Sequence, residues 1–194
     1  MFTIIFSIVI VLVYLLDTFV VVPKGIPIFT KEHIWVGDKQ GYFTKALKLS
    51  EEKIKKGQIW RLFTQVFLHV GVFHILMNVG AMLIVGLAVE EMLGWWKTLL
   101  CFVGSSFISA LCMAFGFKLN DGEGASTGIY GLIAVFLLLA IKNGTILFSA
   151  MPWYLFILLA IYTVGGMFMD KTTSWEHVTG FVGGLLVGSL FVFI

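Results

Sequence analysis

Charged side chains are scarce in this 194-residue chain: Asp, Glu, Lys and Arg make up 12% of it, whereas hydrophobic residues make up 59%. The mean hydropathy is +1.01. A chain with so few charges cannot cover an apolar interior with a water-compatible surface. This composition excludes a cytosolic enzyme, a secreted disulfide-stapled domain and an independent nucleic-acid-binding protein. It predicts an integral membrane protein that crosses the bilayer several times.

Cysteine is almost absent. The two thiols, Cys101 and Cys112, lie eleven residues apart in one apolar run, and a helix separates such backbones by about 16 Å. A disulfide needs Cα atoms within about 7 Å of each other. A bridge between the two is therefore excluded, and we interpret them as buried thiols without a redox role.

Long apolar stretches dominate what is present. A bilayer core of about 30 Å requires roughly 20 apolar residues in a helix. The first stretch has no basic leader and no small-residue cleavage site, so we expect it to remain as a span and not to be a signal peptide. The sequence thus predicts a single all-α membrane domain over residues 1–194 with six membrane-spanning helices. The predicted spans are residues 2–22, 62–89, 95–117, 125–141, 145–169 and 175–194.

The first connection, residues 23–60, differs from the others in length and charge. It contains eight of the lysines, mixed with aromatic residues and isoleucines. Lysine above an interrupted apolar stripe is typical of a segment that lies on the lipid headgroups. We therefore expect an interfacial loop with membrane lipid as its partner. Ordinary anchoring and specific binding of anionic lipid both remain open.

Polar residues gather at the starts of three predicted spans. Because consecutive spans alternate in direction, the starts of the second, fourth and sixth spans lie at one membrane face. These starts carry His74 and Asn78, Ser126, and His177, respectively. Ionisable and polar groups are costly in lipid and usually face a cavity or one another. The pattern predicts a site below the membrane surface.

The residue types at this site fit acyl-transfer chemistry. A serine becomes a nucleophile when a base within hydrogen-bond reach removes its proton, so Ser126 and His177 are the candidate pair. Tyr130 lies one helical turn beyond Ser126, where its ring can pack on the imidazole. His74 and Asn78 also lie one turn apart, and with the Ser126 backbone N–H they are candidate donors to an oxyanion.

Two neighbouring residues suggest other arrangements. Glu176 adjoins His177, but successive helix positions point about 100° apart, so we expect a dyad and not a triad. His69 and His74 would suggest a metal, but a separation of five residues places them on different faces of a helix, unlike the spacing of four in a zinc helix. We expect no metal and no cofactor, and we interpret His69 as structural.

Small residues follow His177 at helical spacing. Gly180, Gly184 and Gly188 form a ridge with it that allows another backbone to approach closely. Packing within one chain is the favoured interpretation, and pairing of two chains is the alternative. The oligomeric state is left open.

Four separated motifs agree with a known family in order and spacing, and together they cover about residues 58–190. On these motifs the chain resembles the rhomboid intramembrane serine proteases. The motifs are Trp60-Arg61, His69-x4-His74-x3-Asn78, Gly124-Ala125-Ser126 and His177-x2-Gly180-x3-Gly184.

The resemblance implies a rhomboid-like bundle of six helices and a role for each matching residue. Ser126 would be the nucleophile and His177 its base, with Tyr130 stacked on the imidazole and with His74 and Asn78 supporting the oxyanion. The remaining matches would be structural. Arg61 would anchor the first loop, and Glu90 would be a structural acid at the far end of span two. The other structural matches are Trp60, Gly124, Gly180 and Gly184.

The implied activity is cleavage of transmembrane segments in other membrane proteins, with span five beside the substrate entrance. The implied site opens to the non-cytoplasmic face, although the lysines of the first loop favour the reverse orientation by the positive-inside rule. We follow the resemblance. A short amino terminus without a soluble appendage fits a small bacterial member in the cell membrane.

Three positions depart from the family pattern. Thr127 follows Ser126 where glycine is common, and Glu176 and Glu123 stand where small residues are common. These departures motivate a second hypothesis, in which the chain is a catalytically silent rhomboid-like protein that binds or escorts membrane clients.

Overall fold

The computed structural model describes residues 1–20, 41–116, 122–144, 151–168 and 171–194. Helices dominate these residues, in agreement with the predicted all-α class. The α-helices are α1 (Phe2–Leu15), α2 (Tyr42–Leu47), α3 (Glu51–Lys55), α4 (Arg61–Thr64), α5 (Val72–Ala81), α6 (Leu87–Leu93), α7 (Trp95–Leu111), α8 (Ser126–Lys142), α9 (Trp153–Met167) and α10 (Lys171–Val192). A 3-10 turn covers Gln65–Phe67, and π-helical turns cover Leu16–Val20, Met82–Gly86 and Cys112–Gly116.

Four continuous helical runs are long and apolar enough to cross a bilayer. They are Phe2–Val20, Val72–Leu93, Trp95–Gly116 and Lys171–Val192. The π-helical turns extend α1 and α7 and join α5 to α6. Helices α8 and α9 are apolar but have 17 and 15 residues, so they are about 25 and 22 Å long. They correspond to predicted spans four and five.

The second predicted span begins ten residues later than expected. Residues 62–67 belong to α4 and the 3-10 turn, and the long helix starts only at Val72. Gly71, with φ of 75°, lies immediately before that helix. A residue with positive φ interrupts a right-handed helix. His69 therefore lies in a connection and not on the helix of His74, so the prediction that the two residues occupy different faces of one helix is wrong.

The last two spans also differ at their starts. Helix α9 begins at Trp153 after Pro152, and residues 145–150 of the predicted span lie outside the described residues. Helix α10 begins at Lys171, four residues before the predicted span. Hydropathy marks where a helix meets lipid, and α10 continues as a helix through polar residues beyond that point.

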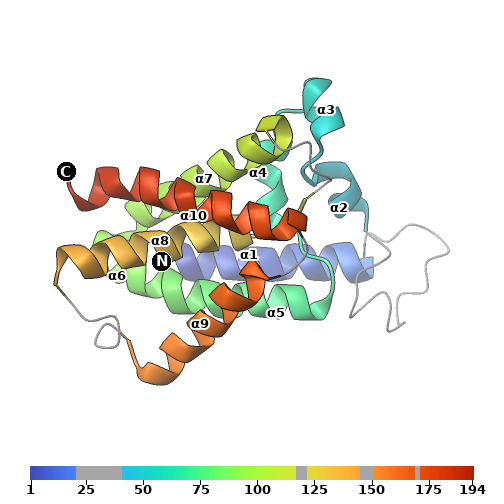
Figure 1. Ribbon diagram of the computed structural model, residues 1–194. Coiled ribbons are helices and arrows are strands. Elements are labelled where there is room, and N and C mark those ends of the chain that lie inside the picture. Colours follow the sequence, from blue (N-terminus) through green and yellow to red (C-terminus); the bar gives the residue numbers. More distant parts are fainter. Residues whose placement is uncertain (21–40, 117–121, 145–150, 169–170) are drawn as a thin grey trace.

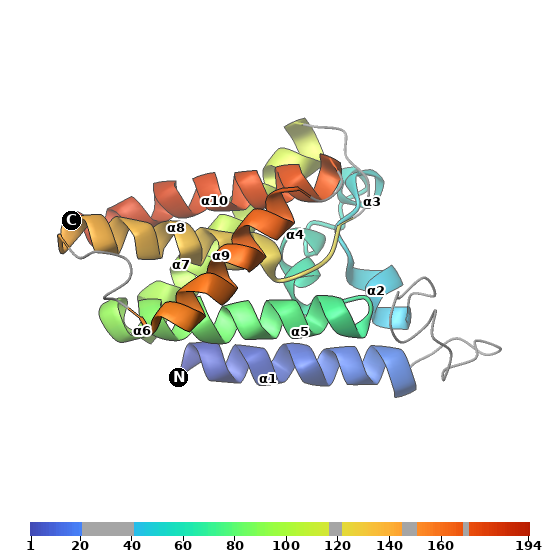
Figure 2. The ribbon, with the colours of Figure 1, turned by 60° about the horizontal axis from the view of Figure 1, so that its bottom comes forward.

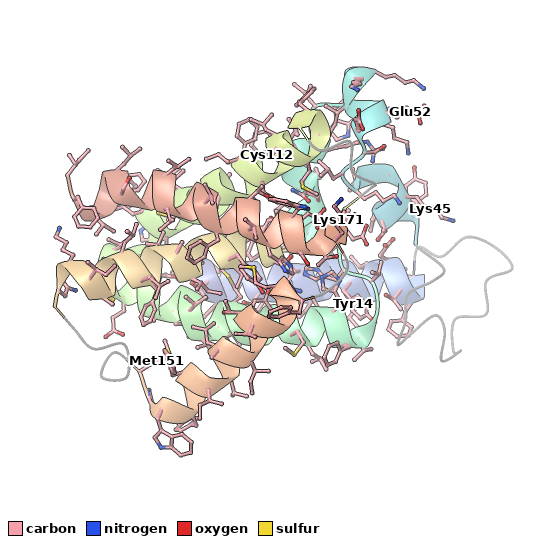
Figure 3. The ribbon with its side chains drawn as sticks, in the orientation of Figure 1. Tyr14, Lys45, Glu52, Cys112, Met151 and Lys171 are labelled. Atoms are coloured by element: carbon pink, nitrogen blue, oxygen red, sulfur yellow. The ribbon has the colours of Figure 1, made fainter. Side chains whose placement is uncertain are left out.

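The predicted alternation of direction is confirmed. Helices α5, α8 and α10 begin at the end of the molecule that carries α2 and α3, whereas α1, α7 and α9 run the opposite way (Figure 1). Figure 3 shows Lys45 and Glu52 at this end, while Met151 precedes α9 at the opposite end. The starts of α5, α8 and α10 are thus brought to one side.

Helix α8 lies at the centre of the bundle. Thirteen of its 17 residues are buried, and it packs against α7 and α10 (Figure 1). A Cβ at Gly180 would overlap the Thr127 carbonyl, and a Cβ at Gly184 would overlap the Gly131 carbonyl. The backbones of α8 and α10 therefore touch where α10 has no side chains.

Acidic side chains hold both ends of α1, which runs beside α5 (Figure 2). At its start, Glu90 of α6 accepts the backbone N–H groups of Phe2 at 3.0 Å and Thr3 at 2.8 Å. At its far end, Asp17 accepts the N–H groups of Phe43 at 2.6 Å and Thr44 at 3.0 Å. The second contact connects the first span to α2, because the carboxylate satisfies the first N–H groups of that helix.

The contact between α8 and α10 can be tested with Gly184→Ala. The added methyl group overlaps the Gly131 carbonyl, so we expect the free energy of unfolding to fall by about 1–3 kcal/mol, as for an overpacked interior. Thermal unfolding of the purified protein in lipid measures this. Gly80→Ala is the matched control, because its Cβ meets no heavy atom within 4 Å. Equal melting temperatures for the two variants would contradict the assignment.

Candidate active site

A cavity of about 690 Å³ lies where α5, α8, α9 and α10 meet. The five residues predicted to form the site from three separate helices all line it. They are His74, Asn78, Ser126, Tyr130 and His177. The lining also includes Val70, Phe73, Met77, Glu123, Ile161, Tyr162, Gly166, Thr172, Thr173 and Glu176.

Ser126 is the first residue of α8 and is buried in the cavity wall. Two residues before it, Gly124 has φ of 132°, a conformation that side chains rarely allow. A Cβ at Gly124 would lie 2.9 Å from His74 Nε2 and 3.7 Å from Ser126 Oγ. Glycine at this position therefore lets the imidazole of His74 approach the turn that presents the serine.

Backbone hydrogen bonds hold the turn before Ser126. Gly122 and Leu49 exchange two of them, with N···O distances of 2.9 and 3.3 Å, and the Gly124 N–H donates to the Gln65 carbonyl at 3.0 Å. The Ala125 N–H donates to Nε2 of His69 at 3.4 Å. The turn is thus attached to the first loop and to the segment before α5.

His69 serves this turn as an acceptor. Because Nε2 accepts the Ala125 N–H, the proton of the neutral ring is on Nδ1. Burial lowers the pKa of His69 well below its ordinary value of 6.5, and the nearby His74 lowers it further. The ring is therefore neutral at pH 7, as its role requires. Its centroid lies 5.0 Å from that of His74.

Arg61 attaches the first loop to α4. Its guanidinium is buried and donates to the Lys48 carbonyl at 2.7 Å and to Gln58 Oε1 at 2.8 Å. Lys48 precedes Leu49, whose backbone pairs with Gly122. Arg61 thus holds the first loop at Lys48, as the resemblance implied, and the next residue of that loop, Leu49, pairs with the serine turn.

His177 is held on two sides. Its Nδ1 lies 2.9 Å from the Gly166 carbonyl of α9, and its ring stacks on Tyr130 with centroids 4.2 Å apart and an interplanar angle of 8°. A carbonyl only accepts, so Nδ1 carries the proton and Nε2 is the acceptor nitrogen of the neutral ring. This tautomer is the one that a base for Ser126 needs.

Tyr130 and Asn78 connect the site to α9. The Tyr130 hydroxyl donates to the carbonyls of Tyr162 at 3.0 Å and Thr163 at 2.8 Å. The Tyr162 hydroxyl donates to Asn78 Oδ1 at 3.4 Å, and Asn78 Nδ2 donates to the His74 carbonyl at 2.9 Å. Asn78 lines the cavity, and its amide nitrogen has a second hydrogen besides the one that the His74 carbonyl accepts.

The departures from the family pattern have different surroundings. Thr127 is buried between helices, with Oγ1 donating to Ser106 Oγ of α7 at 3.2 Å. Glu176 lines the cavity, and its carboxylate packs against Gly122, where a Cβ would overlap it. Glu123 lines the same cavity. Thr127 is thus part of the helix packing, whereas the two acids face the site.

Some lining residues carried no signal in the sequence analysis. Tyr162, Gly166, Thr172 and Thr173 lie on predicted span five or in the connection before span six, where only apolar length was used. The adjacent glycines Gly165 and Gly166 are only a weak signal, because Gly183 and Gly184 form the same pair in α10. Among the described residues, no three His, Cys, Asp or Glu side chains are grouped to hold a metal ion.

A known protein family matches most of the chain. The family model described as the Rhomboid domain matches residues 56–193. The chain belongs to the rhomboid family. The match includes Arg61, the serine turn, α9 and α10, so every residue that lines the cavity lies inside it.

Three relatives of this rhomboid protein are similar to it over 43% to 72% of its length. RHOMBOID-like protein 1 of Arabidopsis thaliana is 30% identical over 142 residues, which are 72% of this chain and 36% of the relative. Rhomboid protease GluP of Bacillus subtilis (strain 168) is 27% identical over 70% of this chain and 27% of the relative. Rhomboid-like protease 2 of Toxoplasma gondii is 40% identical over 43% of this chain and 30% of the relative.

The matched region is about a third of each of these relatives. Their names and the apolar helices support an integral membrane protein of a family that includes proteases. They come from a plant, a bacterium and a parasite. The comparison therefore does not favour the bacterial membrane expected from the sequence.

The serine turn can be tested with Gly124→Ala and Gly122→Ala. The first substitution places a side chain at φ of 132° and 2.9 Å from His74 Nε2, whereas the second meets only the movable Glu176 carboxylate. Strain of about 1–3 kcal/mol would speed hydrogen exchange of amides 122–126 roughly 5- to 150-fold in Gly124→Ala. Mass-spectrometric exchange measures this, and a larger effect in Gly122→Ala would contradict the role of Gly124.

Proposed function

We propose that this rhomboid protein is an intramembrane serine endopeptidase that cleaves transmembrane segments with a Ser126–His177 dyad. The arrangement of His177 is the observation that carries the proposal. A stacked tyrosine and a backbone carbonyl hold the ring in the tautomer with an acceptor Nε2, in the same cavity as Ser126. Family membership and the protease names of two relatives support it.

The proposed reaction has two halves. Nε2 of His177 takes the proton of Ser126 Oγ as the oxygen attacks the scissile carbonyl, and the imidazolium then protonates the leaving amine. Water, with His177 again as base, hydrolyses the acyl-serine and restores the hydroxyl. The Ser126 N–H, the second Asn78 N–H and His74 are the proposed donors to the oxyanion.

Helix α9 is the proposed side of substrate access. Only Leu159 and Tyr162 of its 15 residues are buried, so it is loosely packed compared with α8. A substrate helix that unwinds near its end can reach the cavity beside it. We place this mouth on the non-cytoplasmic side, which thiol labelling of Lys45→Cys and Lys142→Cys in intact cells tests. Labelling of only Lys142→Cys would reverse the orientation.

Ser126→Ala is expected to abolish cleavage of a transmembrane substrate in lipid vesicles, because no other nucleophile is proposed. A fluorophosphonate probe should label the unaltered protein and not the variant. Unchanged cleavage by Ser126→Ala would remove the assignment. Client binding by a protein that neither cleaves nor is labelled would instead support the alternative, a catalytically silent rhomboid-like protein that binds or escorts membrane clients.

Asn78→Ala is expected to lower kcat roughly 10²-fold through the loss of one oxyanion donor. The measurement is the initial rate of cleavage at saturating substrate. Because Asn78 also accepts a hydrogen bond from Tyr162, Tyr162→Phe is the control: it removes that hydrogen bond, keeps the ring and should retain most of the rate. Equal losses in the two variants would argue that Asn78 acts through Tyr162 alone.

A further inference from the structure

We infer that Gly166 of α9 is the positioning residue for His177, through its carbonyl and through its missing side chain. This inference rests on the proposed function for its kinetic consequence only. Its structural part concerns the tautomer of one imidazole, which can be observed in a protein that does not cleave anything.

The first support is the hydrogen bond itself. His177 Nδ1 lies 2.9 Å from the Gly166 carbonyl, and His177 is 4% exposed. In a buried site a ring N–H needs an acceptor, because an unmet donor is costly. The carbonyl therefore selects the Nδ1–H tautomer, as a carboxylate does in a serine protease triad.

The second support is steric. A Cβ at Gly166 would overlap the Tyr130 hydroxyl and lie 2.9 Å from His177 Nδ1 and 3.0 Å from its Cε1. Glycine thus allows the stacked pair of rings to reach the backbone of α9. The neighbouring Gly165 also lines the cavity, but its Cβ would meet no heavy atom within 4 Å.

The third support is the place where three helices meet. Tyr130 of α8 donates to the Tyr162 and Thr163 carbonyls of α9 and stacks on His177 of α10. The last turn of α9 thus holds both rings of the pair. Movement of that turn away from α10 would separate the carbonyl from Nδ1, so readiness of the base depends on the position of α9.

Gly166→Ala and Gly165→Ala provide the kinetic test. We expect Gly166→Ala to lower kcat by about tenfold or more with little change in KM, because a base in the wrong tautomer slows chemistry and not binding. Gly165→Ala should keep kcat within about twofold. Equal kcat values for the two variants would overturn the inference.

The structural test is the ¹⁵N NMR spectrum of histidine-labelled protein in the Ser126→Ala background. The His177 signal is assigned by its loss in His177→Gln. We expect the Nδ1–H tautomer in the Ser126→Ala protein and in the same protein with Gly165→Ala. With Gly166→Ala added instead, we expect a mixture of tautomers or the Nε2–H tautomer. An unchanged Nδ1–H tautomer in Gly166→Ala would overturn the inference whether or not the protein is a protease.

A melting temperature of Gly166→Ala well below that of Gly165→Ala would mean that the overlap with Tyr130 disturbs folding. The same comparison is then made in Tyr130→Phe, which removes the overlapped hydroxyl but keeps the ring. In this background, a His177 tautomer that differs between Gly166→Ala and Gly165→Ala supports the inference. The same tautomer in both variants overturns it.

Discussion

The close approach of the α8 and α10 backbones is the constraint on which the site depends. Gly180 and Gly184 contact the backbone of α8 at Thr127 and Gly131. This contact begins one residue after Ser126 and three residues after His177, so it fixes the two candidate catalytic side chains relative to each other. Hydrophobicity alone drives little association between helices in lipid, and packing of small residues takes its place.

A second layer of contacts positions the serine turn. The first loop reaches it through Leu49, and Arg61 holds the preceding residue of that loop. His69 contacts the turn from the other side, through Ala125. These groups use backbone polar atoms that would otherwise be unmet in a buried turn. The long first loop thus has a structural role at the site in addition to any contact with lipid.

Apolar length, topology and motif spacing predicted the long apolar helices and the convergence of His74, Ser126 and His177 on one cavity, but not the short helices α2 and α3 of the first loop. They failed at the start of span two, because the non-helical segment from Leu68 to Gly71 precedes α5 without a break in the apolar sequence. They also failed at Gly166, since a backbone carbonyl has no signature in a sequence. The predicted dyad has no third side chain, whereas the structure places a backbone carbonyl 2.9 Å from Nδ1 of His177.

A carbonyl partner suits an imidazole in a membrane. A buried carboxylate must be removed from water at a cost of several kcal/mol, and this cost is not always recovered by its ion pair. A peptide carbonyl carries no net charge and still accepts the Nδ1–H. The carboxylate of the adjacent Glu176 packs instead against Gly122. A carbonyl of α9 thus takes the place of a carboxylate at Nδ1 of His177, and the proposed base depends on the helix beside which a substrate is proposed to enter.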